Sequence, residues 1–133
     1  MSGDPGDPGD LRARIDAIEE AYEFFLAYAA QGLSSDQGSK SGGQLRDFLS
    51  RAGAALDGLV PAFGAALAAG ELTPAPAWRD MLDVLERDAT AAAAAVALVA
   101  SRDSISSQLV DNLNANIHLR ALLTDLFLLD EAR

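Results

Sequence analysis

The sequence contains no cysteine and only one histidine, His118. Without cysteine, the chain can form neither a disulfide nor a thiolate metal site, and it has no cysteine nucleophile. A single histidine cannot supply the two Glu-x-x-His motifs of a di-iron bundle, and no serine lies in the sharp-turn motif of a hydrolase nucleophile. Walker and dinucleotide-binding glycine motifs are also missing. We therefore expect a protein that is not an enzyme and that uses no metal or other cofactor.

Positive charge is also scarce, with ten lysine and arginine residues against twenty acidic ones and a formal net charge of -10. This balance argues against partners such as nucleic acid or an anionic membrane surface, since both attract basic proteins. An uncharged alanine-rich run, residues 89–101, has only 13 residues, whereas a membrane span needs about 20. The opening MSGDPGDPGD also lacks the pattern of a signal peptide. We expect a cytoplasmic protein.

Aromatic residues make up only 6% of the chain, but half of its residues are hydrophobic and alanine is abundant. This composition is typical of closely packed helices. Apolar residues recur at alternating steps of three and four, the heptad spacing that keeps one stripe facing a neighbouring helix. The pattern predicts four helices, over about residues 10–32, 43–69, 74–101 and 104–131. Because these helices are similar in length, we predict an all-α fold, an antiparallel four-helix bundle with coiled-coil-like packing.

Proline and glycine divide the chain into segments. The opening repeat GDPGDPGD has no apolar residue to bury and predicts a disordered acidic tail over residues 1–9, followed by one domain over residues 10–133. Pro61 lies within the second predicted helix, where it removes a backbone hydrogen bond and crowds the carbonyl of Asp57. We therefore expect this helix to be kinked near Pro61, with the break close to Gly58.

The last predicted helix carries a polar ridge. Asn112, Asn116 and Arg120 recur every four residues beside an apolar ridge, so they share one side of a continuous helix. On a helical wheel Arg120 lies near the centre of the apolar arc, where a buried guanidinium needs a carboxylate partner. These three residues are our candidate ligand-binding site. Two other interpretations stay open. One is a buried polar stripe that fixes helix register, and the other is a slightly rotated helix with Ile117 and Leu128 in the core and Arg120 at its edge.

The same helix has more apolar surface than one bundle contact requires, because LLTDLFLLDEA is apolar almost all round. The surplus side chains are Leu122, Leu126 and Leu129. On the first predicted helix, Phe24 and Tyr28 also lie off the apolar stripe. We predict that these five residues form an interface with a protein partner or with a second copy of the chain. The alternative is a thicker core under the loops.

These patterns leave three hypotheses about function. The first is a non-catalytic accessory or assembly protein that binds a partner, or itself, through the last helix and the outer side of the first. The second is a small-ligand-binding or sensing bundle that uses the polar ridge. The third and most distant is phosphotransfer through His118. Histidine phosphotransfer domains are four-helix bundles of this size, but HLRALL lacks the lysine and glycine that follow their phosphorylated histidine.

Overall fold

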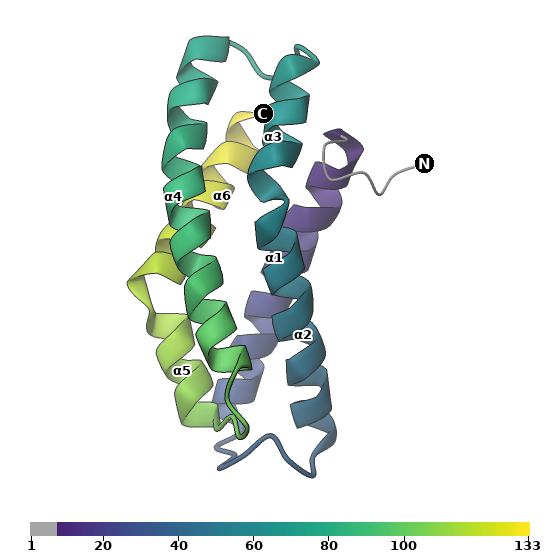
Figure 1. Cartoon of the computed structure of the whole chain (residues 1–133), viewed down its shortest axis with the longest axis vertical. Coiled ribbons are helices and arrows are strands. Elements are labelled where there is room, and N and C mark those ends of the chain that lie inside the picture. Colours follow the sequence, from purple (N-terminus) through teal and green to yellow (C-terminus); the bar gives the residue numbers. More distant parts are fainter. Residues whose placement is uncertain (1–7) are drawn as a thin grey trace.

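The computed structural model describes residues 8–133, and every regular element in that range is an α-helix. The all-α prediction is therefore confirmed, while the predicted tail over residues 1–9 lies almost entirely outside the described residues. The helices are α1 (Pro8–Ala30), α2 (Lys40–Asp57), α3 (Leu59–Ala68), α4 (Ala75–Ala100), α5 (Ser107–Ala115) and α6 (Ile117–Ala132). The predicted count of four helices is wrong, because two of the predicted helices are each divided in two (Figure 1).

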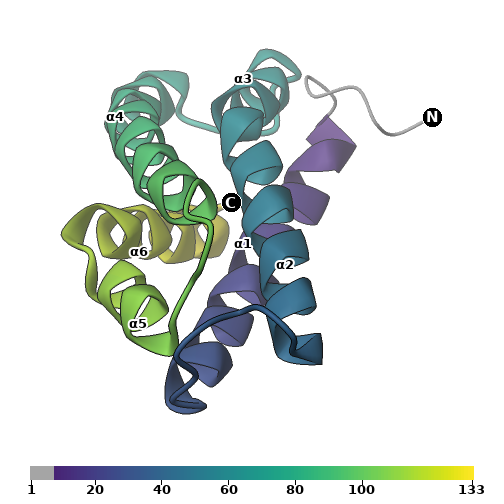
Figure 2. The same ribbon diagram turned by 60° about the horizontal axis from the view of Figure 1, so that its bottom comes forward.

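The helices pack into an elongated bundle (Figure 1). α1 contacts α2, α3 and α5, and α4 contacts α2, α3 and α6. Figure 2 shows that α5 and α6 meet at a marked angle, and in the view of Figure 1 α6 crosses behind α4. α4 buries the whole stripe that its apolar spacing predicts. The buried residues of α4 are Trp78, Leu82, Leu85, Ala89, Ala92, Val96 and Val99.

The first break lies at Gly58, where the kink near Pro61 was expected. α2 ends at Asp57 and α3 begins at Leu59, so Pro61 falls in the first turn of α3, where proline is tolerated because the amides of a first turn have no acceptor within their own helix. Arg14 of α1 reaches the break and donates from Nη1 to the carbonyl of Ala54 over 2.9 Å. A β-carbon at position 58 would overlap the Arg14 guanidinium. The glycine thus makes room for the side chain that satisfies the end of α2.

The second break, at Asn116, is a correction to the predicted helix over residues 104–131. Asn116 has an extended backbone (φ -61°, ψ 128°), and its side-chain oxygen accepts from the amides of His118 and Leu119 over 3.0 and 3.2 Å. Asparagine competes well with helical backbone bonds when it caps a new helix. Because the backbone leaves the helical path at Asn116, the faces of α5 and α6 are not aligned, and a single helical wheel cannot place the side chains of both helices.

Two loops are joined at the end of the bundle where α1 and α4 finish. Asp36, in the first loop, is buried, and its carboxylate accepts from Arg46 Nε over 2.9 Å and from the amide of Ile105 over 2.7 Å. Arg46 also donates to the carbonyls of Ala100 and Arg102, over 3.0 and 2.8 Å. One guanidinium therefore ties α2 to both loops and caps the last carbonyl of α4.

Candidate protein-binding surface

The structure separates the three residues of the predicted ligand site. Asn112 is exposed on α5, Asn116 caps α6, and Arg120 is exposed on α6. The interpretation that placed Arg120 in the core is wrong, because the break at Asn116 rotates α6 relative to α5. The rotated-helix alternative also fails, since it buried Ile117 and Leu128, which are 74% and 59% exposed. The hollows described below are lined by other residues.

The five residues of the predicted interface lie mostly inside the chain. Tyr28, Leu122, Leu126 and Leu129 are buried in the core. Phe24 is half-buried, and its ring stacks on Phe48 of α2 with the centroids 4.6 Å apart. The surplus apolar surface assigned to a partner is thus largely used within the chain itself.

A different set of side chains forms the exposed apolar surface of α6. Of the five large hydrophobic residues exposed in the described chain, three lie on this helix, namely Ile117, Phe127 and Leu128, and Phe127 is 56% exposed. Exposed residues recur along α6 at steps of three and four, the spacing of a helix contact surface. We call this set the α6 stripe. It consists of Ile117, Arg120, Thr124, Phe127, Leu128 and Glu131.

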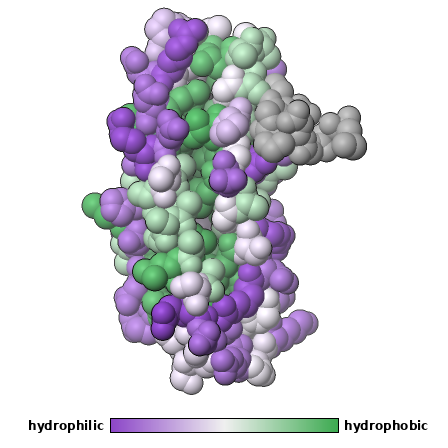
Figure 3. Space-filling model, viewed as in Figure 1, coloured by the Kyte–Doolittle hydropathy of each residue, from purple (hydrophilic) through white to green (hydrophobic). Residues whose placement is uncertain are grey.

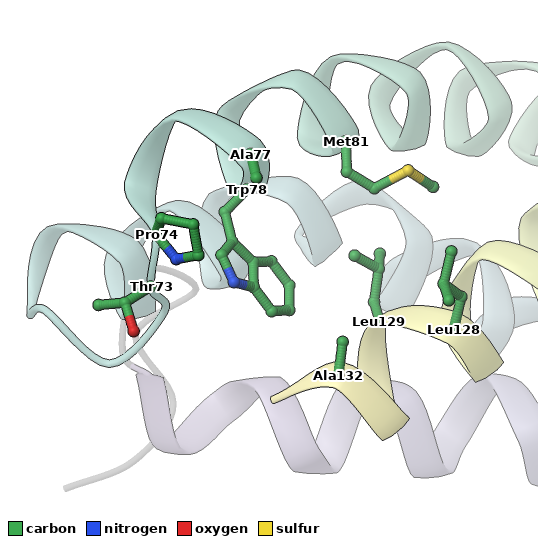
Figure 4. Close-up of a pocket in the computed structure, with 8 residues that line it drawn as sticks. All are labelled: Thr73, Pro74, Ala77, Trp78, Met81, Leu128, Leu129 and Ala132. Carbon is green, nitrogen blue, oxygen red and sulfur yellow. The ribbon is translucent and has the colours of Figure 1, made fainter.

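An apolar hollow of about 410 Å³ adjoins the α6 stripe, between the start of α4 and the end of α6. Trp78 and Met81 project from α4 toward Leu128 and Leu129 of α6 (Figure 4). Trp78 is the only tryptophan of the chain, and Met81 is its only methionine besides Met1. We call this hollow the α4–α6 groove. Its lining residues are Thr73, Pro74, Ala77, Trp78, Met81, Leu128, Leu129 and Ala132.

A pair of acids lies between the same two helices. Asp125 of α6 interacts with Asp88 of α4, and Oδ2 of Asp125 is buried without a hydrogen bond among the described residues. Burial, followed by the hydrogen bond and the negative charge of Asp88, raises the pKa of Asp125 to about 7. Other charges nearby belong to a different cluster, because Asp130 of α6 pairs with Arg12 of α1 over 2.9 Å. The carboxyl group of Asp125 therefore keeps its proton to a higher pH than an exposed aspartate does.

A second hollow, of about 580 Å³, lies between α3 and α4. Figure 3 shows hydrophobic residues along the middle of this face, with hydrophilic residues at its edges. Small residues such as Gly64, Ala89 and Ala93 line it beside Asp57 and Glu86. These small side chains fill less of the space between α3 and α4 than larger ones would, which accounts for the hollow.

Comparison with protein-family models, with curated proteins and with solved structures finds no match to this chain. Within residues 8–133, no helix is long and apolar enough to cross a membrane. The described residues also contain no group of three or more side chains placed to hold a metal ion.

The sequence reasoning missed both the α6 stripe and the α4–α6 groove. The available signal was Asn116 itself, since asparagine is a preferred residue at the start of a helix. Numbering the wheel from Ile117 alone places Leu122, Leu126 and Leu129 on one face and Arg120, Thr124 and Phe127 on another. The groove left no signal, because it depends on how the ends of α4 and α6 meet.

Proposed function

We propose that this chain is a non-catalytic assembly protein that binds another polypeptide through the α6 stripe and the adjoining α4–α6 groove. The observation that carries the proposal is the gathering of Ile117, Phe127 and Leu128 on one helix of 16 residues, beside a groove lined by Trp78 and Met81. Clustered exposed apolar side chains are typical of binding surfaces. Aromatic and methionine side chains are enriched there, because they bury large areas and adapt to their partner.

The charge distribution supports the same proposal. The chain has a net charge of -10, whereas the α6 stripe carries one positive residue, Arg120, and one negative residue, Glu131. Charges are depleted at the centre of interfaces, and a strongly charged remainder keeps a free subunit in solution. We further infer that the fold is an antiparallel four-helix bundle with two broken columns, α2–α3 and α5–α6, and that the protein works in the cytoplasm.

The other two hypotheses have less support. A ligand site built from Asn112, Asn116 and Arg120 needs these side chains to converge, but they lie on separate helices and at the break between them. His118 is exposed in the first turn of α6. Phosphotransfer through His118 therefore rests on exposure alone and remains the most distant proposal.

Native mass spectrometry of the chain isolated from its natural source tests the proposal. We expect a complex of the chain with at least one further polypeptide. The double variant Phe127→Ser/Leu128→Gln should lose this complex while its helical circular dichroism stays unchanged, because both side chains are exposed. The control Leu26→Gln alters an exposed leucine of α1 and should keep the complex. An isolated monomer, or a complex that survives the double variant, would overturn the proposal.

A further inference from the structure

We infer that the polypeptide bound by the α6 stripe is a second copy of this chain, with the two α6 helices antiparallel about a twofold axis. This inference rests on the proposed function and names its partner. Its starting point is the order of residues along the stripe. Arg120 lies toward one end and Glu131 lies at the other, with Thr124 and Phe127 between them.

This order is self-complementary only in the antiparallel direction. When two copies of α6 meet with their axis midway between residues 125 and 126, Arg120 of each faces Glu131 of the second copy. Thr124 then faces Phe127. Two opposite-charge pairs thus flank two contacts between Thr124 and Phe127, so charged residues form the rim around the aromatic rings. In a parallel pair, Arg120 would face Arg120 and Glu131 would face Glu131, and like charges would repel.

The remaining charges of α6 do not oppose this pairing. Asp130 is paired with Arg12 over 2.9 Å and with Arg133 over 3.0 Å, and Asp125 is turned toward Asp88 of α4. The stripe is therefore neutral in sum. A strongly basic partner, which the overall charge of -10 would attract, finds no excess of acids on the stripe itself. A second copy matches its alternation of charge and apolar surface better.

The distance between Arg120 and Glu131 along α6 distinguishes an antiparallel pair from a parallel one. Arg120 and Glu131 are eleven residues apart, or about 16 Å along the helix axis at 1.5 Å per residue. In the antiparallel pair the two arginines are therefore far apart, while each lies beside a glutamate of the other copy. Both side chains are exposed, so replacing them leaves the core of each chain intact.

Sedimentation equilibrium with charge-reversed variants tests the inference. The purified wild-type chain, examined from about 1 μM to about 500 μM, the range of weak interfaces, should form a dimer. Arg120→Glu and Glu131→Arg should each raise the dimer Kd about tenfold, since each creates two like-charge contacts. The double variant, Arg120→Glu with Glu131→Arg, should restore the wild-type Kd. A wild-type monomer throughout, or single variants that the double variant does not rescue, would overturn the inference.

Disulfide trapping tests the direction of the pair, and the chain has no native cysteine to interfere. Under mild oxidation, a mixture of Arg120→Cys and Glu131→Cys chains should form a covalent dimer. Neither variant alone should do so, because a disulfide joins α-carbons no more than about 7 Å apart. Equal trapping in the separate samples would overturn the antiparallel arrangement. A complex with a different polypeptide in native mass spectrometry, together with a monomeric purified chain, would overturn self-pairing and leave the proposed function supported.

Discussion

Nε of Arg46 lies 2.9 Å from Oδ2 of Asp36, and this ion pair joins α2 to the loop after α1. The second oxygen of Asp36 accepts the amide of Ile105 over 2.7 Å, so the same carboxylate also holds the loop before α5. Asp36 is 7% exposed. A carboxylate this buried is stable only while its donors are present.

Removing the guanidinium should therefore destabilise the fold. We predict that Arg46→Met lowers the free energy of unfolding by about 2 to 3 kcal/mol, because it leaves Asp36 buried with one donor fewer. Urea unfolding followed by circular dichroism measures the loss. Arg51→Met is the matched control, since Arg51 lies over the Phe48 ring, 4.3 Å from its centroid, on the exposed side of α2, and its loss should cost less than about 1 kcal/mol. Equal losses in the two variants would contradict a specific stabilising role for the ion pair between Arg46 and Asp36.

Asp36 also makes stability depend on acid pH. Burial acts to raise the pKa of Asp36, but hydrogen bonds from Arg46 and from the Ile105 amide outweigh it and lower the pKa below its ordinary value. The unfolded chain therefore binds this proton at a higher pH than the folded chain does. The stabilisation is present above about pH 4 and is lost as the pH falls through the folded pKa.

The acid pair between α4 and α6 has the opposite pH dependence. Because the pKa of Asp125 is raised to about 7, the folded chain holds a proton between about pH 4 and pH 7 that the unfolded chain releases. Stability should fall as the pH rises through this window. We predict that Asp125→Asn, which carries no charge beside Asp88, raises the free energy of unfolding by about 2 kcal/mol at pH 8 and by little at pH 5.

Thermal unfolding at several pH values measures this effect. Asp111→Asn, at an exposed position of α5, is the control and should shift stability equally at both pH values. A destabilised Asp125→Asn variant at pH 8 would mean that the ionised carboxylate has a stabilising partner.

Two adjacent glycines at the start of α2 should respond oppositely to alanine. A β-carbon on Gly42 would overlap the backbone oxygen of Asp36, whereas a β-carbon on Gly43 meets nothing within 4 Å. We predict that Gly42→Ala lowers the free energy of unfolding by about 2 to 3 kcal/mol through overpacking. Gly43→Ala should raise it by up to about 1 kcal/mol, since alanine is the better helix former. Chemical denaturation of both variants checks the contrast, and a tolerated Gly42→Ala would show that the loop is not held against α2.

The capping role of Asn116 can be tested by comparison with Asn112, which the sequence placed on the same polar ridge. Asn116→Ala removes the acceptor of two amides, those of His118 and Leu119, and should cost about 1 kcal/mol of unfolding free energy. Asn116→Asp should retain most of that stability, because aspartate caps equally well. Asn112→Ala, on the exposed face of α5, should change stability by less than about 0.5 kcal/mol. Equal costs at positions 112 and 116 would argue for one continuous polar ridge.

The sequence was sufficient to predict the helical class and the break at Gly58, because heptad spacing and an interior proline act locally. It was not sufficient to locate the break at Asn116. There, a local cap competes with a continuous helix, and the outcome depends on how α6 packs against α4. Leu122, Leu126 and Leu129 were recognised as surplus to one contact, but only the packed structure shows that they complete the core. The exposed residues of α6 are set by the rotation of α6 relative to α5 at the Asn116 break.

Site-specific photocrosslinking in the producing cells tests whether the α6 stripe is a binding surface. A photoreactive amino acid at position 128, in the α6 stripe, should give one discrete polypeptide adduct in the cells that produce the protein. The same group at position 50, exposed on α2, a helix that does not pack closely on α6, should give none. An adduct at position 128 alone, with the mass of either two copies or the chain and one partner, is the result that we predict. No adduct at position 128, or the same adducts at both positions, would contradict a binding surface on α6.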